Sequence, residues 1–291
     1  MNEYVIITDS TTDLGPDILK DMDVRVLPLK YTIEGKTYDD NTDVIVMDTH
    51  EFYDKLRAGS MSKTTQLNAD EFKAAFTEYL EAGKDILYIG FSTGLSGTFQ
   101  SACIARDDIM ESYPERKLIC VDSLAASMGE GLLVYEADKL RKEGKSIEEV
   151  AQWLKDNVDH MAHWFTVDDL NFLKRGGRVS AATAVVGTVL GIKPILHVDD
   201  EGHLINVGKV RGRKASLDAL VNKIGETASI DPAKQTIFIS HGDCIEDAKY
   251  VAKQIMLKYK TKDIKIHYVG PVIGGHAGPG VVALFFFANK K

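Results

Sequence analysis

Two clusters of hydroxyl side chains and one histidine are the residues in this sequence best suited to holding a small anion. The first cluster is the turn Gly90-Phe91-Ser92-Thr93-Gly94, between an apolar run at 86–89 and a helix expected at 98–109. A strand, a glycine-rich turn and a helix N-terminus bring backbone N–H groups and a positive dipole end together, and this arrangement binds anions. The turn has no lysine, and the sequence lacks the pattern that cradles a nucleoside triphosphate. It therefore favours a small, singly charged group such as a carboxylate.

The second cluster is Lys63-Thr64-Thr65-Gln66, which we expect to form a loop, and the histidine is His276, in a glycine-rich segment near the end of the chain. A buried carboxylate costs several kcal/mol unless it is hydrogen-bonded, and hydroxyl donors with an imidazole meet that need. Structural explanations stay open beside the functional one. A Ser/Thr-rich turn often serves as a helix cap, and a loop threonine often bonds its own backbone. We expect the segment 271–280 around His276 to be a loop.

Two other functions compete for the same glycine-rich turn. Gly90-Phe91-Ser92-Thr93-Gly94 also matches the Gly-x-Ser-x-Gly nucleophile elbow, so an α/β-hydrolase acting as an esterase or thioesterase, with Ser92 and His276, is the alternative. It would leave the second hydroxyl cluster unexplained. A dinucleotide site is the third reading, but the glycine spacing is not Gly-x-Gly-x-x-Gly, and Asp122 is the only candidate for the acidic residue.

The elements that must position these residues indicate an α/β protein of two domains. Strands expected at 4–8, 24–29, 86–89 and 117–121 alternate with helices, which predicts a doubly wound parallel sheet in an N-terminal domain, residues 1–160. Ligands of such sheets bind beyond the carboxyl ends of the strands, where the polar turns gather. In residues 161–291 hairpins mix with helix–strand units and a small-residue helix is expected at 181–190, so we predict a C-terminal α/β domain with a mixed sheet.

Composition narrows the function classes. The 291 residues carry a net charge of −8, which argues against nucleic acid as a partner. Three scattered cysteines and eight histidines without paired ligand spacing indicate neither a disulfide framework nor a metal site. There is no signal-peptide pattern, and the apolar runs are too short for a transmembrane segment. We therefore expect a cytoplasmic protein.

Taken together, the motifs resemble those of the DegV family of bacterial fatty-acid-binding proteins. The matching segments follow the family's order over almost the whole chain, and the ordered set is specific although each piece alone is weak. They are Thr8-Asp9-Ser10-Thr11-Thr12-Asp13-Leu14, Lys63-Thr64-Thr65-Gln66, the stretch from Ser92 to Ala102, Val167-Asp168-Asp169-Leu170 through Arg178-Val179-Ser180, Lys193-Pro194-Ile195-Leu196, Lys209-Val210-Arg211-Gly212 and His276-Ala277-Gly278-Pro279-Gly280.

This resemblance implies two α/β domains with a long-chain fatty acid, such as a C16–C18 acid, between them. It also implies a carrier without catalytic residues or a cofactor of its own, which presents the acid to a separate fatty-acid kinase for conversion to an acyl phosphate. A role of this kind in phospholipid metabolism is compatible with transient contact with a membrane surface.

Carried over residue by residue, the resemblance assigns the fatty-acid carboxylate to Thr64, Thr93 and His276, with Ser92 and Thr65 as near neighbours. Basic residues of the second domain, Arg178 and Arg211, are implied in the kinase step. The sequence departs from the family pattern at Thr65, Leu67 and Thr93, where serine, proline and serine are usual. These departures leave open whether Thr64 or Thr65 donates to the head group.

Overall fold

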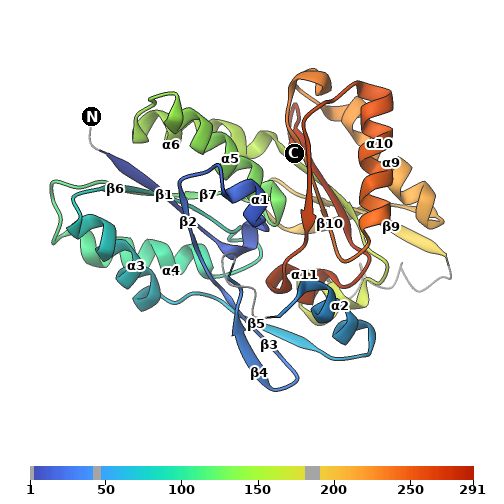
Figure 1. The fold of residues 1–291 in the computed structure, drawn as a ribbon, viewed down its shortest axis with the longest axis horizontal. Coiled ribbons are helices and arrows are strands. Elements are labelled where there is room, and N and C mark those ends of the chain that lie inside the picture. Colours follow the sequence, from blue (N-terminus) through green and yellow to red (C-terminus); the bar gives the residue numbers. More distant parts are fainter. Residues whose placement is uncertain (1–2, 42–46, 181–190) are drawn as a thin grey trace.

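The computed structural model of this chain describes residues 3–41, 47–180 and 191–291. Two larger β-sheets lie side by side, and a small third sheet extends away from both (Figure 1). The N-terminal residues build the first sheet and the C-terminal residues build the second. The predicted α/β class, with a parallel sheet in the N-terminal part and a mixed sheet in the C-terminal part, is confirmed. No helix in these three ranges is long and apolar enough to cross a membrane.

The first sheet has the strand order β2-β1-β6-β7, and every neighbouring pair is parallel. Adjacent residues of β1 face opposite sides: Ile6 packs in one core cluster and Ile7 in another. Helices therefore cover both faces, as the alternation of strands and helices predicts. The elements are β1 (Tyr4–Asp9), β2 (Val24–Leu27), β6 (Asp85–Gly90), β7 (Leu118–Asp122), α1 (Pro16–Leu19), α3 (Ala69–Glu81), α4 (Thr98–Met110), α5 (Met128–Lys142) and α6 (Ile147–Asn157), with a 3-10 turn at Ser10–Thr12.

The second sheet has the order β10-β9-β8-β13-β11-β12, and only β11 and β12 pair in parallel. Helices α9 and α10 lie next to each other against its outer face (Figure 1). Helix α5 contacts strands of both sheets and so lies between them. The elements are β8 (Met161–Thr166), β9 (Ile192–Val198), β10 (Leu204–Arg211), β11 (Ile237–His241), β12 (Ile264–Tyr268), β13 (Val282–Phe287), α7 (Asn171–Arg175), α9 (Arg213–Thr227) and α10 (Ile245–Tyr259), with 3-10 turns at Val158–His160 and Pro232–Lys234.

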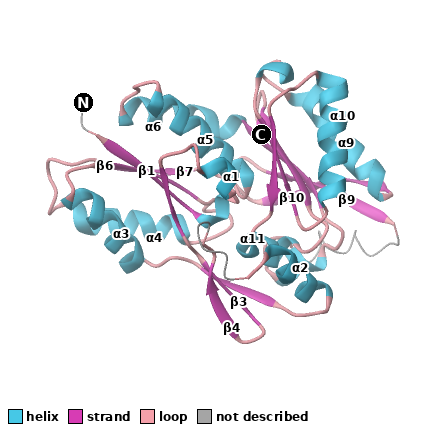
Figure 2. Cartoon of the chain, viewed as in Figure 1, coloured by secondary structure: helices cyan, strands magenta, loops and turns pink. Residues whose placement is uncertain are grey.

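The small sheet consists of β4 (Lys36–Asp39), β3 (Lys30–Ile33) and β5 (Ser62–Thr65), all antiparallel (Figure 2). Glu34 and Gly35 form the predicted hairpin turn with φ of 51° and 77°, the left-handed pair that two-residue hairpins require. The predicted loop at 62–66 is wrong over β5, because these residues, alternately half-buried and exposed, pair with β3. Helix α2 (Thr49–Arg57) follows in sequence between β4 and β5.

The glycine-rich segment near the C-terminus also differs from its predicted loop. Residues Pro271–Ala277 form helix α11, with Pro271 in its first turn, where its fixed φ and missing N–H suit a helix start. Gly278 ends this helix with φ of 80°. By contrast, the reciprocal cap predicted between Asn68 and Glu71 is confirmed at the start of α3. The helix predicted at 181–190 lies outside the described residues.

Candidate functional site

A cavity of about 510 Å³ lies between the two larger sheets, and aliphatic and aromatic side chains make up most of its wall. Phe165, Ala283 and Phe285 contribute from the inner face of the second sheet, and Leu95 and Phe91 from the loop that follows β6. A cavity with such a wall suits an apolar ligand, whose burial is favourable in proportion to its area.

Thr64 and His276 form the polar centre at the edge of this cavity. Thr64 Oγ1 lies 2.9 Å from His276 Nε2, within hydrogen-bond distance, and both residues line the cavity. Strand β5 supplies Thr64 and helix α11 supplies His276, so the two elements that the sequence analysis took for loops are the ones that create this pair. The contact leaves one hydroxyl proton or one lone pair of Thr64 available to a third group.

His276 is a neutral imidazole at pH 7. Burial is the main cause, and the nearby Arg178 guanidinium adds to it, so that the pKa of His276 falls to about 4. The ring is also held on its other side by backbone, since a Cβ on Gly176 would lie 2.3 Å from His276 Nδ1. Glycine at position 176 is therefore what allows the imidazole to lie against the α7 segment while it reaches Thr64.

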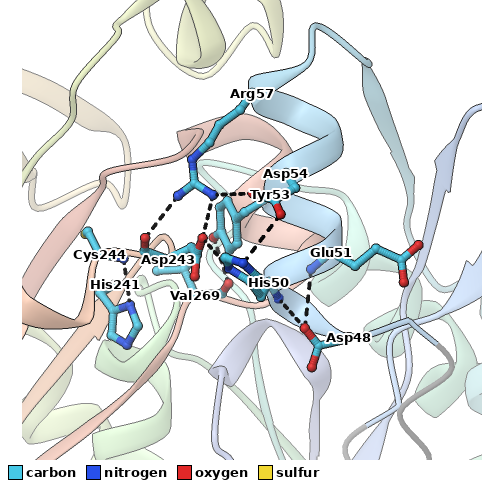
Figure 3. A network of polar contacts seen from close by, with 10 residues as sticks. All are labelled: Asp48, His50, Glu51, Tyr53, Asp54, Arg57, His241, Asp243, Cys244 and Val269. Atoms are coloured by element: carbon cyan, nitrogen blue, oxygen red, sulfur yellow. Dashed lines mark hydrogen bonds and ion pairs between the residues drawn. The ribbon is translucent and has the colours of Figure 1, made fainter.

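Helix α11 is fixed in turn by α2, through Tyr53. The Tyr53 hydroxyl donates to the Val269 carbonyl at 2.8 Å, and a Cβ on Gly274 would lie 2.4 Å from that hydroxyl oxygen. Figure 3 shows helix α2 joined to the turn after β11. There Arg57 donates to the Asp243 carboxylate at 2.5 Å, and His50 Nδ1 lies within hydrogen-bond distance of the same carboxylate, at 2.8 Å. This network attaches helix α2, which lies between β4 and β5 in the sequence, to the C-terminal part of the chain.

The network in Figure 3 also brings ligand atoms of His50, Asp54 and Asp243 within 4.8 Å of one another. Arg57 already forms ion pairs with both carboxylates and compensates one of their two negative charges. The geometry is that of a salt-bridge network, and none of its charged residues, His50, Asp54, Arg57 and Asp243, lines the cavity.

Ser96 and Gly97 are cavity-lining residues that the sequence analysis did not select. Ser96 Oγ accepts from the Thr98 backbone N–H at 3.3 Å and lies 2.9 Å from Thr98 Oγ1. The pair sits at the N-terminus of α4, where the helix dipole is positive and favours an anion. The signal was present in the sequence: of the hydroxyl residues in the turn, Ser96 is the last one before Gly97, the N-cap of α4.

Thr93 and Ser92, by contrast, point away from the cavity. Thr93 is exposed and its hydroxyl donates to Asp122 at 2.6 Å, so both the implied carboxylate donor and the candidate dinucleotide acid are engaged with each other. Ser92 is fully buried, and its hydroxyl donates to the Gly202 carbonyl at 3.0 Å. The imidazole of His276 is bonded to Thr64 and not to Ser92, so the geometry of a Ser–His nucleophile pair is not formed here.

Of the remaining predicted site residues, some line the cavity and one does not. Thr65 and Arg178 line the cavity, whereas Arg211 is exposed at the end of β10 and lines neither this cavity nor the one next to it. Arg178 donates from Nε to the Leu95 carbonyl at 3.2 Å and from Nη1 to the Gly176 carbonyl. It thus ties the α7 segment to the loop before α4, directly beside His276.

A second, outer pocket of about 340 Å³ shares Thr64, Arg178 and His276 with the first. Lys63 and Arg175, both exposed, add positive charge to it, and its described lining contains no carboxylate. The polar pair therefore has an apolar cavity on one side and a basic pocket on the other.

Comparisons with known proteins agree with this arrangement. Residues 3–289 match the family model described as "Uncharacterised protein, DegV family". A DegV domain-containing protein of Clostridium perfringens is 46% identical over 291 residues, covering 100% of this chain and 99% of the relative.

Two similar solved structures come from the same family. A DegV family protein from Eubacterium eligens, loaded with heptadecanoic acid, has a TM-score of 0.86 at 25% identity, covering 98% of this chain and 100% of that one. A DegV family protein from Thermus thermophilus, described for its fatty-acid binding, has a TM-score of 0.85 at 29% identity, covering 99% and 100%. Sequence, fold and cavity thus lead to the same conclusion, and the chain belongs to the DegV family.

Proposed function

We propose that this protein binds a long-chain fatty acid, with the carboxylate at the Thr64–His276 pair and the acyl chain in the apolar cavity. The observation that carries the proposal is the 2.9 Å contact between Thr64 and a neutral His276 at the edge of a mostly apolar cavity. Solved relatives of the same fold, described as binding fatty acids, support it.

The chemistry of the pair suits a carboxylate. If His276 Nε2–H donates to Thr64 Oγ1, the Thr64 hydroxyl proton is free to donate to the acid. Ser96 and Gly97 also line the cavity, where the N-terminus of α4 adds positive potential and the Ser96 hydroxyl adds a hydrogen-bonding group. A carboxylate placed beside His276 favours the imidazolium form, so binding the acid raises the pKa of His276 above its value in the free protein.

Burial of the chain supplies most of the affinity. A buried methylene contributes about 0.8 kcal/mol, so a C16 chain offers on the order of 12 kcal/mol before the costs of ordering it. The Thr64–His276 pair determines the orientation of the fatty acid, with its carboxylate at the edge of the cavity. The apolar cavity wall determines the affinity for the acyl chain.

We further propose that the protein presents the acid to a fatty-acid kinase through the outer pocket. An acyl phosphate carries more negative charge than the acid, and the basic groups of Lys63, Arg175 and Arg178 surround the side of the polar pair that faces away from the acyl cavity. The phosphoryl donor would bind the kinase. Arg211, exposed outside both pockets, is proposed as a contact with that partner.

The first experiment is to extract the purified protein under denaturing conditions and identify the released lipid by mass spectrometry. We expect one long-chain fatty acid per chain, with a clearly lower occupancy in the Thr64→Ala/His276→Ala double variant. Thr93→Ala is the matched control, because its hydroxyl bonds Asp122 outside the cavity, and it retains the acid. A protein that carries no fatty acid and takes none up from solution contradicts the proposal.

The kinase step is tested separately, by trapping acyl phosphate with hydroxylamine in the presence of the partner kinase and ATP. Lys63→Ala/Arg175→Ala is expected to keep its bound acid and lose most acyl-phosphate formation. Normal phosphorylation in this variant would exclude the outer pocket as the route. Arg211→Ala, with unchanged acid binding, reports whether that arginine contributes to the kinase contact.

A further inference from the structure

Cys103 and Cys120 are two thiols for which the proposed fatty-acid chemistry has no use. Both are partly exposed free cysteines, and neither lines the acyl cavity or the outer pocket. Cys103 lies on α4 and Cys120 on β7, the outermost strand of the first sheet. Helix α4 connects β6 to β7 and contacts β7. The fold therefore packs the helix that carries one cysteine against the strand that carries the other.

The strand register and the helix period bring the two side chains to the same place. Cys120 is the register partner of Tyr88 on β6, so the two side chains lie on the same face of the sheet. On that face the ring of Phe99, in the first turn of α4, stacks on Tyr88 with 6.2 Å between centroids. Cys103 follows Phe99 by one helical turn, on the same side of α4. Phe99 thus covers β6, and Cys103 lies over Cys120 on the neighbouring strand.

The two thiols differ in acidity. A hydrogen bond with Cys120 is the main reason that the pKa of Cys103 falls to about 7; burial opposes this change, and the Arg106 guanidinium supports it. The same hydrogen bond and burial raise the pKa of Cys120 well above its usual value. Two carboxylates act against Arg106, and one of them, Asp107, accepts from Arg106 Nε at 2.8 Å; the other is Asp122. At neutral pH the pair therefore offers one nucleophilic thiolate beside one protonated thiol.

The third cysteine provides a contrast within the same chain. Cys244 is also partly exposed, but burial raises the pKa of its thiol to about 12, and its Sγ donates to the Val281 carbonyl at 3.3 Å. Because the thiolate is the reactive form of cysteine, exposure alone does not make a cysteine reactive. The acidity and the pairing of Cys103 set it apart from Cys244.

We propose that Cys103 and Cys120 are a redox-active thiol pair, which a peroxide converts into a reversible intramolecular disulfide. The Cys103 thiolate attacks one oxygen of hydrogen peroxide and the O–O bond breaks, which leaves a sulfenic acid on Cys103 and a hydroxide that is protonated to water. The Cys120 sulfur then attacks the Cys103 sulfur, the S–S bond forms, and the S–O bond breaks to release a second water. The two thiols lose two electrons and the peroxide gains them.

A disulfide at this place would join two elements near the head-group end of the cavity. The N-terminus of α4 carries Ser96 and Gly97, which line the cavity. The last residue of β7, Asp122, accepts from the Thr93 hydroxyl in the turn before α4. Since both sulfurs lie outside the cavity lining, the chemistry of the pair is independent of the proposed fatty-acid binding.

The first test uses the unmodified protein. After treatment with hydrogen peroxide, intact-mass spectrometry is expected to show a loss of about 2 Da, restored by dithiothreitol. Peptide mapping is expected to find one link, between the peptides that contain Cys103 and Cys120. Before oxidation, iodoacetamide at pH 7 should label Cys103 at least about ten times faster than Cys244.

Serine variants then identify the role of each thiol. Cys120→Ser is expected to stop at a sulfenic acid on Cys103, trapped as a dimedone adduct, whereas Cys103→Ser should form neither the adduct nor the link. Cys244→Ser is the matched control and keeps the loss of about 2 Da. The proposal is overturned if the wild type shows no such mass loss, if the bond includes Cys244 or joins two chains, or if Cys103 and Cys244 are labelled at the same rate.

Discussion

Thr64 and His276 are 212 positions apart in the sequence and 2.9 Å apart in the structure. One comes from an edge strand of the small sheet and the other from a short helix that precedes the last strand. The contact therefore exists only when the small sheet, α11 and the second sheet are all in place, and head-group binding depends on all three.

Replacement of Thr64 by valine tests the head-group assignment, because valine keeps the shape and removes the hydroxyl. We expect fatty-acid affinity to fall about tenfold, since a charged group loses one hydrogen bond in a partly buried site. Thr64→Ser retains the hydroxyl and should bind nearly as well as the wild type. Affinities from fluorescent fatty-acid displacement decide the matter, and equal binding by valine and serine variants would rule Thr64 out.

Ser96 and Thr93 offer a comparison within one turn. Ser96 lines the cavity, whereas the Thr93 hydroxyl is bonded to Asp122. We expect Ser96→Ala to weaken fatty-acid binding several-fold and Thr93→Ala to leave it unchanged, both measured by isothermal titration. A larger loss of binding in Thr93→Ala than in Ser96→Ala would assign the carboxylate to Thr93, as the family resemblance implies.

The buried state of His276 predicts a pH dependence of stability. Its pKa is about 4 in the folded protein against 6.5 as the ordinary value, so the unfolded chain binds more protons between these pH values. The stabilisation is therefore full above about pH 6.5 and is lost as pH falls through the folded-state value. We expect the melting temperature to fall more steeply between pH 7 and pH 4.5 in the wild type than in His276→Gln. Parallel curves would mean that the imidazole is solvated in the folded state.

Gly176→Ala is expected to disturb the head-group pair without touching it directly. The new Cβ would lie 2.3 Å from His276 Nδ1, so the ring has to move away from Thr64. Fatty-acid affinity should fall at least several-fold while circular dichroism stays native. Gly208→Ala is the control, because the nearest atom to its Cβ is 3.9 Å away. Unchanged binding in Gly176→Ala would show that the ring position is not critical.

The surface network around Asp243 predicts a difference between two carboxylates. The Asp243 side chain is 10% exposed and receives bonds from Arg57 and His50, whereas Asp54 contacts the same two residues at 57% exposure. Asp243→Asn keeps a residue that tolerates the observed φ of 54°, and we expect it to lower unfolding free energy by about 1–2 kcal/mol. Asp54→Asn should change it by less than about 0.5 kcal/mol. Urea denaturation measures both, and equal effects would mean that the network is solvated throughout.

The sequence was informative where local pattern decides structure. The parallel first sheet follows from apolar runs separated by helices, and the cap between Asn68 and Glu71 follows from their spacing. The small sheet was missed at β5 because Ser62–Thr65 contains no apolar side chain, and its strand conformation comes from pairing with a distant hairpin. Helix α11 was missed because its glycines disfavour a helix by propensity, whereas close packing of Gly274 against Tyr53 and of Gly275 against Ser62 favours glycine at both positions.

The candidate site was likewise only partly predictable from the sequence. Thr64, Thr65, Arg178 and His276 line the cavity, but motif spacing does not tell which hydroxyl of a turn faces inward. Ser96 replaces Thr93 at the cavity wall because the turn between β6 and α4 directs Thr93 toward Asp122. His163 carries no motif at all, and only the register of β8 against β13 brings it to the cavity.

The position of the cavity between two sheets has a consequence for how the molecule responds to lipid supply. Its walls come from β-strands of the C-terminal sheet and from loops of the N-terminal one, so a bound acyl chain would act as a shared core segment donated from outside the polypeptide. Occupancy would then couple the opening of the two halves, and amide exchange in both sheets would slow together when lipid is plentiful. In such a protein the resistance to unfolding is itself a readout of the lipid available to it.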